Sequence, residues 1–199
     1  MISMNSEHLR LCSSEEWAAT VEHEILPWAI GAHDLGDDLL EIGPGPGLTT
    51  DRLRHLAPHL TAVEVDQSLA DALRTRLAGS NVEVVHADAA ALPLADARFS
   101  GATCFTMLHH VPSPADQDRL FNELHRVLRP GGVLVGVDSL PSAEWLALHA
   151  DDTCVPVDPT ELPARLTRAG FVDVEVELSQ PRPSRRFRFA ARAGLSPRG

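Results

Sequence analysis

Hydrophobic positions near the start of the chain follow the period of an α-helix. Apolar side chains recur at positions i, i+4, i+8 and i+11: Trp17, Val21, Ile25 and Trp28. This spacing places them on one face, so it predicts an amphipathic helix that packs against a core. The pair Ser13 and Glu16 has the spacing of a capping box and predicts the start of this helix. Pro27 and Gly31 are expected to kink or end it.

From residue 39 onward, short apolar runs alternate with segments of helical pattern. Strands are predicted at 39–42, 60–65, 82–86, 100–106 and 133–138, and helices at 48–57, 67–78 and 114–128. Strands separated by helices form a parallel sheet that is covered on both faces. Residues 139–159 are predicted to be irregular. A helix near 160–169 follows, and the alternating runs 172–178 and 186–193 are expected to pair antiparallel at the sheet edge.

The length of 199 residues suits one domain. We expect three parts within it: an N-terminal helical cap over residues 1–36, a ligand-binding core over 37–138, and a substrate-side segment over 139–199. The last part contains the irregular stretch, the helix and the C-terminal antiparallel strands. The sequence contains no internal repeat that would predict a second domain.

The composition excludes several classes of chemistry. The chain has no Lys and no Tyr, which excludes a Schiff-base lysine, a Walker-type phosphate loop and a tyrosine acid or base. Cys12, Cys104 and Cys154 contain no C-x-x-C pair, which disfavours a disulfide framework or a sulfur-rich zinc site. We expect a reducing, cytoplasmic setting, because the first residues lack the apolar core of a signal peptide and no run is long enough to span a membrane.

Charge is unevenly distributed along the chain. The formal net charge is −11, and residues 1–179 hold 11 Arg against 28 Asp plus Glu, which gives −17. An acidic body repels nucleic acid, so we expect a small-molecule partner rather than nucleic acid or a membrane. Residues 180–199 hold six Arg and no acid. Two roles stay open for this end: a strand with outward Arg side chains, or a site for an anion.

A glycine-rich turn provides the strongest local signal. The sequence LLEIGPGPG covers residues 39–47 and places alternating glycines between a strand and a helix, which allows the backbone to approach a ligand closely. The glycines are spaced G-x-G-x-G, not G-x-G-x-x-G as in dinucleotide-binding proteins. Pro44 and Pro46 also remove two amide donors, which makes the loop a poor site for pyrophosphate. A nicotinamide cofactor is therefore disfavoured.

Acidic residues follow the next two strands. Glu64 ends the second strand and lies 23 residues after Glu41, about the separation at which such folds place an acid against ribose hydroxyls. Asp66 competes for this role, but it lies beyond the strand end, so Glu64 is preferred. Asp88 follows the third strand, where it is suited to accept a hydrogen bond from the exocyclic amine of adenine. Ligands of open α/β sheets bind at this carboxyl edge.

Five ordered motifs resemble the class I S-adenosylmethionine-dependent methyltransferases, in particular the small-molecule subfamily with a Leu-His-His-Val turn. The motifs are LLEIGPGPG, AVEVD, HADAAALP, FTMLHHVP and LRPGGVLVGVD, and they cover about residues 37–138. The resemblance implies an α/β fold with a doubly wound, mostly parallel seven-stranded sheet, helices on both faces and S-adenosylmethionine as cofactor. It also implies these contacts: Glu41, Gly43, Gly45 and Gly47 with the methionine part, Glu64 with the ribose, Asp88 and Ala89 with the adenine, and Phe105 and Thr106 with the sulfonium end.

Histidines near the expected acceptor end are candidates for a catalytic base. His109 and His110 follow the fourth strand, and one of the two is expected to point inward. His149 lies in the irregular stretch with Asp151 and Asp152, where a carboxylate would orient its imidazole ring.

Two other roles stay open for this histidine and its acidic neighbours. The first is a site for a divalent ion such as magnesium, with further ligands drawn from this set: Asp138, Glu22, His23 and Glu24. The second is a purely structural loop, in which Asp152 or Asp158 bonds local amides.

The expected function is methyl transfer to a hydroxyl of a small molecule, which is either a saccharide or glycoside or a flat aromatic compound. The alternatives are carbon or nitrogen methylation of a quinol or other metabolite, and a non-catalytic regulator that binds S-adenosylmethionine. The turn CFTMLHHVP lacks the Pro-Pro-aromatic pattern of adenine methyltransferases. Cys104 lies in an apolar strand and is expected to be a core thiol. We expect a monomer or a homodimer, the latter formed through Trp17 and Trp28.

Overall fold

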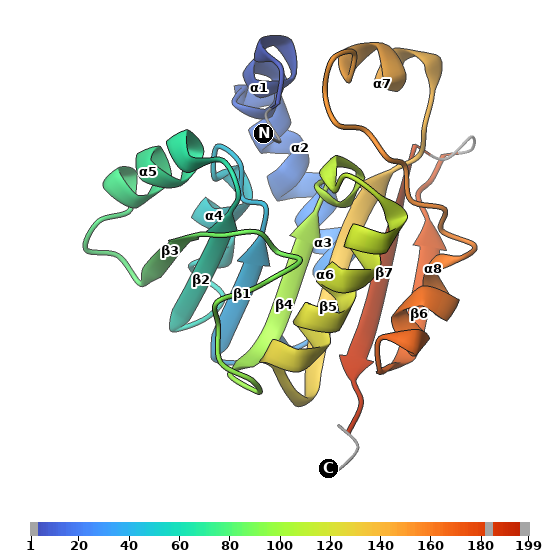
Figure 1. The fold of residues 1–199 in the computed structure, drawn as a ribbon. Helices are drawn as coiled ribbons and strands as arrows, with labels where there is room; N and C mark the ends of the chain where they lie inside the picture. The colour runs from blue at the N-terminus through green and yellow to red at the C-terminus, as the bar shows by residue number, and fades with distance from the viewer. Residues whose placement is uncertain (1–3, 182–184, 196–199) are drawn as a thin grey trace.

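A seven-stranded sheet forms the centre of the molecule (Figure 1). The computed structural model describes residues 4–181 and 185–195. The strands are β1 (Asp38–Ile42), β2 (His59–Glu64), β3 (Val82–His86), β4 (Phe99–Phe105), β5 (Leu128–Ser139), β6 (Phe171–Leu178) and β7 (Arg186–Ala193). They lie in the order β3-β2-β1-β4-β5-β7-β6. The predicted α/β class, with a doubly wound and mostly parallel sheet, is confirmed.

The strand β7 runs opposite to its neighbours. β1 pairs in parallel with β2 and β4, β2 with β3, and β4 with β5. β7 pairs antiparallel with both β5 and β6. The two C-terminal strands therefore do form an antiparallel pair, with β6 at the sheet edge and β7 one position inside. The carboxyl ends of β1 to β5 point to one side of the sheet, which is where ligands of such folds bind.

Helices cover both faces of the sheet (Figure 1). On one face, α6 (Pro114–Val127) and α8 (Leu162–Arg168) pack over residues such as Leu40 and Leu134. On the other face, α3 (Leu26–Ile30) and α4 (Leu48–Leu53) pack over residues such as Leu39 and Val133, and α5 (Gln67–Arg76) covers β2 and β3. Successive strand residues point to opposite faces, so a strand that is covered twice is apolar throughout. Within the described residues, no helix has the length and apolar character to cross a lipid bilayer.

The N-terminal cap contains a helix that the sequence pattern did not predict. Its helices are α1 (Ser6–Cys12) and α2 (Glu15–Thr20). Ser14 caps α2, because its side-chain oxygen accepts a hydrogen bond from the Trp17 amide at 3.1 Å. Ser13 lies at the end of α1, where its hydroxyl donates to the Leu9 carbonyl at 2.7 Å. The predicted capping by Ser13 is therefore wrong by one residue.

The predicted amphipathic helix continues from α2 through a π-helical turn, η1 (Val21–Ile25), into α3. Pro27 comes directly after the π-helical turn, and the helix ends at Gly31. Val21 and Ile25 are each 2% exposed and belong to the core. The apolar stripe therefore faces the interior, as its spacing predicts.

Two further boundaries differ from the prediction. The helix expected over 48–57 ends at Leu53, five residues before Pro58, whose ring disfavours helical geometry in the residue before it. The segment 139–159, which was expected to be irregular, contains the short helix α7 (Ala143–Leu148). Ser142 caps this helix by accepting a hydrogen bond from the Trp145 amide.

The arginine-rich end forms a strand. Arg186, Arg188 and Arg192 lie on β7. Arg188 donates to Glu177 on β6 at 2.6 Å and to the Trp28 carbonyl at 2.9 Å. Two other arginines of this end, at positions 182 and 198, lie outside the described residues.

Candidate active site

The glycine loop after β1 lies at the carboxyl end of the sheet. Gly43, Gly45 and Gly47 have φ values of 67°, 54° and 90°, a backbone conformation that residues with side chains rarely adopt. A Cβ on Gly45 would point into open space, with the Met4 methyl at 4.0 Å as the nearest atom. A Cβ on Gly47 would instead collide with Leu73 of α5, whose Cδ1 lies 2.4 Å away. Gly45 therefore faces a cleft, whereas Gly47 packs against a helix.

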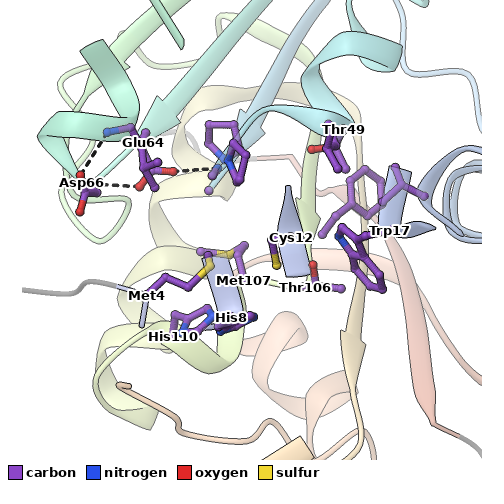
Figure 2. Close-up of a pocket in the computed structure, with 18 of the residues that line it drawn as sticks. Met4, His8, Cys12, Trp17, Thr49, Glu64, Asp66, Thr106, Met107 and His110 are labelled. Carbon is purple, nitrogen blue, oxygen red and sulfur yellow. Dashed lines mark hydrogen bonds between the residues drawn. The ribbon is translucent and has the colours of Figure 1, made fainter. Parts of the chain in front are cut away.

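A cleft beside the glycine loop contains about 900 Å³ of space, part of which is open to solvent. The glycine loop and the end of β2 form one wall, and the N-terminal helices form the other (Figure 2). Several apolar side chains line it: Trp17, Val21, Ile25, Phe105 and Met107. The polar lining includes His8, Thr49, Glu64, Thr106 and His110.

A second cavity of about 580 Å³ adjoins the first. The two share lining residues that include Gly43, Val65 and Met107, so they form one two-lobed cleft along the carboxyl ends of the strands. Asp88 and Ala89, which follow β3, border the second lobe. Asp88 also forms a local turn, because its Oδ1 accepts the hydrogen bond of an amide two residues later at 2.8 Å.

Glu64 and Asp66, the rival candidates for binding a sugar, have different partners. Glu64 is 5% exposed, and its two oxygens accept the amides of Gly45 and Asp66, each at 2.9 Å. Asp66 caps α5, because its Oδ1 accepts the amides of Ser68 and Leu69. Burial raises the pKa of Glu64, and its backbone hydrogen bonds oppose that shift. Both residues border the cleft, but the Asp66 carboxylate is committed to the helix end.

Glu41 lies behind the glycine loop and is 1% exposed. Its Oε1 accepts a hydrogen bond from the Thr49 hydroxyl, and its buried Oε2 has no partner among the described residues. Burial raises the pKa of this carboxyl to about 7, and the hydrogen bond from Thr49 opposes the shift. Glu41 does not border the cleft itself, so its connection to the cleft runs through Thr49.

The adjacent histidines of η2 (Leu108–His110) have different surroundings. His109 is 2% exposed, and its Nδ1 lies 2.6 Å from Oδ1 of the buried Asp138. His110 is the one of the pair that borders both lobes of the cleft. Its Nδ1 lies 3.0 Å from the Thr153 carbonyl, which only accepts, so Nδ1 carries the proton. Burial lowers the pKa of His110 to about 3, which keeps its ring neutral.

His149 lies behind the cleft wall. It follows α7, is 4% exposed and does not border either lobe. Its Nδ1 lies 2.6 Å from the Trp145 carbonyl, and its Nε2 lies 3.1 Å from Nε2 of His109. Burial lowers the pKa of His149. This position does not support direct contact between His149 and a substrate in the cleft.

The carboxylates expected around His149 are dispersed. Asp152 turns toward α1, where its Oδ2 lies 3.0 Å from Nδ1 of His8, and Asp151 is exposed. Glu22 pairs with Arg52 on α4 instead. The carboxylate-rich magnesium site considered from the sequence is therefore not assembled. The local capping role does hold for Asp158, which accepts the Thr160 amide at 2.8 Å.

Sequence reasoning missed His8 and Cys12, which border the cleft from α1. Their spacing of four residues places them on one helical face, and Asn5 caps that helix by accepting the His8 amide at 2.9 Å. The four-residue spacing and the Asn5 cap are the sequence features from which this helix and its inward face could have been predicted. Cys104, in contrast, is fully buried in β4, as expected of a core thiol.

Comparison with known proteins decides the family. A probable S-adenosylmethionine-dependent methyltransferase of Mycobacterium tuberculosis is 31% identical over 157 residues, which are 76% of this chain and 55% of that protein. Residues 40–136 match the family model described as a methyltransferase domain. The chain belongs to the class I S-adenosylmethionine-dependent methyltransferases.

The chain also resembles a demethylmenaquinone methyltransferase of Clavibacter sepedonicus, at 31% identity over 64% of this chain and 49% of that protein. It spans about half the length of the curated relatives that it matches. Among solved structures, a SAM dependent methyltransferase from Archaeoglobus fulgidus aligns over 89% of this chain and 93% of that chain, with a TM-score of 0.70 at 18% identity. This likeness supports the fold.

Most of the residues expected at the cofactor border one of the two lobes: Gly43, Gly45, Glu64, Asp88, Ala89, Phe105 and Thr106. Glu41 and Gly47 lie behind the loop instead. Gly47 thus shapes the start of α4, and its expected contact with the methionine part does not agree with its packing.

Proposed function

We propose that this methyltransferase transfers the methyl group of S-adenosylmethionine to a hydroxyl group of a small molecule. The observation that carries the proposal is the division of the cleft: the glycine loop and Glu64 line one side, whereas Trp17, His8 and His110 line the other. The first side is suited to the cofactor and the second to the acceptor. A saccharide and a phenol both fit this description, because the Trp17 ring is able to pack against the apolar face of either.

The residues present fit the cofactor. The space in front of Gly45 admits a ligand where any side chain would intrude. After its two backbone bonds, each oxygen of Glu64 keeps a lone pair, and two such acceptors suit the vicinal hydroxyls of a ribose. The unpartnered Oε2 of Glu41 favours a positive charge in its neighbourhood. When bound, S-adenosylmethionine supplies an electrophilic methyl group on a sulfonium sulfur.

The second lobe is suited to the adenine. Val65 and Ala89 offer apolar surface for a flat ring, and the Asp88 carboxylate is an acceptor for its exocyclic amine. Phe105 and Thr106, at the end of β4, are placed between the glycine loop and the N-terminal helices and would meet the sulfonium end.

The acceptor side contains imidazoles. A hydroxyl must be aligned with the methyl group and must lose its proton, so it needs a polar group at this place. Burial lowers the pKa of both His8 and His110, so both rings are neutral at physiological pH. Neutral imidazoles offer a lone pair that orients a hydroxyl by accepting its hydrogen bond, although a lowered pKa makes them weaker bases.

The proposal is tested with the purified protein, isotope-labelled S-adenosylmethionine and a panel of phenols, sugars, quinols and amines, each assayed with and without added divalent ions. Matched compounds whose hydroxyl is already methylated serve as controls. We expect label on the oxygen of at least one hydroxyl compound, identified by mass spectrometry and NMR, and none on its matched control. Label found only on carbon or nitrogen would overturn the proposal.

A quinol is the second acceptor class to examine, because the relative from Clavibacter sepedonicus is named a demethylmenaquinone methyltransferase. A quinol offers both a hydroxyl and a ring carbon, so the position of the label separates the two reactions. Tight binding of S-adenosylhomocysteine without turnover of any compound would instead favour a non-catalytic regulator.

A further inference from the structure

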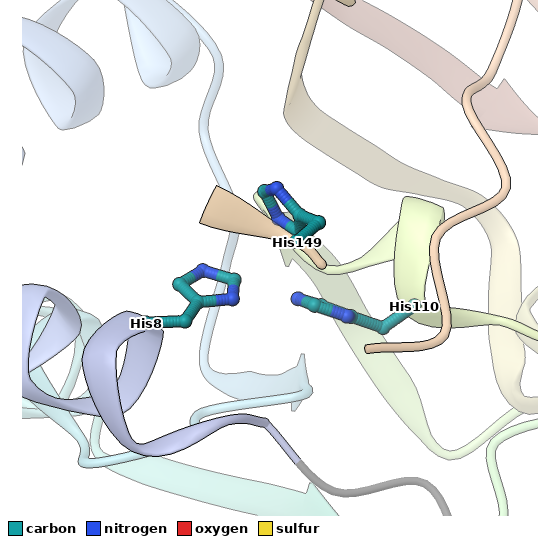
Figure 3. Close-up of side chains that lie close together, drawn as sticks. All are labelled: His8, His110 and His149. Carbon is teal, nitrogen blue, oxygen red and sulfur yellow. The ribbon is translucent and has the colours of Figure 1, made fainter. Parts of the chain in front are cut away.

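Three histidines from distant parts of the chain converge beside the cleft. His8 comes from α1, His110 from η2 and His149 from the end of α7, and Figure 3 shows their rings facing one another. One ligand atom of each lies within 4.8 Å of the other two. His8 and His149 are buried and His110 is half-buried. Imidazole is polar, so burying three such rings together costs free energy and requires a compensating interaction.

The hydrogen bonds define which nitrogen of each ring is free. The partner of Nδ1 is an oxygen in every case: Asp152 for His8 at 3.0 Å, the Thr153 carbonyl for His110 at 3.0 Å, and the Trp145 carbonyl for His149 at 2.6 Å. Carbonyl and carboxylate oxygens accept, so each Nδ1 carries a proton and each Nε2 keeps a lone pair. An outer oxygen partner of this kind is typical of histidines that bind metals.

Two of the four rings meet through their Nε2 atoms. Nε2 of His149 lies 3.1 Å from Nε2 of His109, whose Nδ1 faces Oδ1 of Asp138 at 2.6 Å. This contact requires either a proton on Nε2 of His109, which would be donated to His149, or a cation beside the two nitrogens. The Nε2 atom of His110 is buried without a partner among the described residues. Such unpaired buried groups are costly.

Two buried carboxylates stand behind these rings. The side chains of Asp152 and Asp138 are 1% and 0% exposed. Buried negative charge requires a compensating positive charge nearby. A divalent cation among the rings would compensate the negative charge of both carboxylates. His8 lies between the cation and Asp152, and His109 lies on the side of Asp138.

We propose that His8, His110 and His149 bind one divalent transition-metal ion of the zinc class through their Nε2 atoms. Imidazole nitrogen suits zinc, copper, nickel and iron, whereas magnesium prefers oxygen ligands. Zinc–nitrogen bonds of about 2.0–2.1 Å place tetrahedral ligand atoms about 3.3 Å apart. One ring nitrogen of each histidine already lies within 4.8 Å of a ring nitrogen of the other two, so binding an ion requires the rings to move closer together by about 1–2 Å.

The ion would join the N-terminal cap to α7 of the substrate-side segment across the carboxyl edge of the sheet. α1 and α7 both lie above this edge in Figure 1, and His8 and His110 border the acceptor side of the cleft. The site is therefore a three-histidine centre, which leaves a fourth coordination position for water or a ligand. This inference concerns the ion alone and holds whichever acceptor is methylated.

Metal binding is measured without S-adenosylmethionine or an acceptor, so the test is independent of the proposed reaction. The full chain is stripped with a chelator and titrated with Zn²⁺ by calorimetry and with Co²⁺ by visible absorption. We expect one ion per chain and the intense absorption of tetrahedral Co²⁺. His8→Ala and His110→Ala should each weaken Zn²⁺ binding by about 100-fold or more, and Asp152→Asn by about 10–100-fold. His55→Ala, at an exposed histidine of a turn, is the matched control and should bind like the wild type.

Binding of Zn²⁺ to His8→Ala or His110→Ala with wild-type affinity would overturn the inference, as would the lack of a stoichiometric site in the wild type. Thermal unfolding checks that each variant is folded. If an alanine variant does not fold, the comparison of Asp152→Asn with the wild type decides. The melting temperature of the wild type should rise with Zn²⁺, and that of Asp152→Asn should require a higher concentration for the same rise.

Discussion

The amide of Gly45 donates a hydrogen bond to Oε2 of Glu64 at 2.9 Å, which fastens the glycine loop to the end of β2. The same carboxylate is the group proposed to meet the ribose. One side chain shapes the loop and, in our proposal, also binds the ligand. Its loss should therefore weaken cofactor binding both directly and through the loop.

Glu64→Gln should weaken the binding of S-adenosylhomocysteine by about 10–100-fold. The amide keeps one acceptor oxygen where the carboxylate has two, and hydrogen bonds to a charged group contribute about 1.5–3 kcal/mol. Calorimetry measures the effect, with Asp71→Asn, at an exposed acid of α5, as the control. Equal affinities of Glu64→Gln and the wild type would remove Glu64 from the cofactor site.

Gly45→Ala and Gly79→Ala form a matched pair. The two glycines have φ values of 54° and 78°, so alanine strains the backbone at both positions. We expect each to lower the free energy of unfolding by about 1–2 kcal/mol. A Cβ at Gly79 meets nothing within 4 Å, whereas one at Gly45 enters the cleft. Only Gly45→Ala should therefore lose affinity for S-adenosylhomocysteine, by at least about tenfold; a similar loss in both variants would contradict this assignment.

The raised pKa of Glu41 makes stability dependent on pH. Burial raises its pKa from 4.5 to about 7, so the folded state holds this proton more tightly than the unfolded state. The associated stability is complete below pH 4.5 and is lost as the pH rises to about 7. The loss is about 3 kcal/mol, at 1.36 kcal/mol per pKa unit. Urea unfolding at several pH values should show that the free energy of unfolding falls less steeply with rising pH in Glu41→Gln than in the wild type. Parallel curves for the two proteins would contradict the prediction.

His109→Ala should destabilise the fold rather than only reduce activity. It leaves the fully buried Asp138 without the ring that pairs with it at 2.6 Å. Breaking a buried pair on one side costs about 3–5 kcal/mol. Urea unfolding measures the change, and His55→Ala, at an exposed position, should differ from the wild type by less than about 0.5 kcal/mol. A loss of activity in His109→Ala without loss of stability would indicate a direct role in the reaction.

Local patterns made much of the fold predictable. The strands follow from apolar runs between helical segments, and the apolar stripe ending at Trp28 follows from helical spacing, because both patterns report burial directly. The glycine loop was predictable for a related reason. Gly43 and Gly45 adopt positive φ angles that few other residues tolerate, so their identity records the backbone conformation.

The parts that escaped prediction depend on contacts between distant residues. His8 and Asp152 are 144 positions apart, and no local pattern joins them. Gly47 shares the spacing of Gly45, but its orientation is fixed by packing against Leu73. His109 and His110 are adjacent in sequence, and only the position of Asp138 decides which of them turns away from the cleft. The predicted role of these histidines in the reaction stays a prediction.

The position of β7 has a consequence for the synthesis of the protein. This strand follows β6 in the sequence, yet it lies between β5 and β6 in the sheet and contributes Phe187 and Phe189 to the core. A nascent chain that ends before residue 186 has an unpaired β5 edge, and its β6 has no strand to join. Because a ribosome releases the chain from the N-terminus onward, the sheet closes only after residues 186–193 have left the ribosome. Until then the exposed edge is a surface on which chaperones are expected to act.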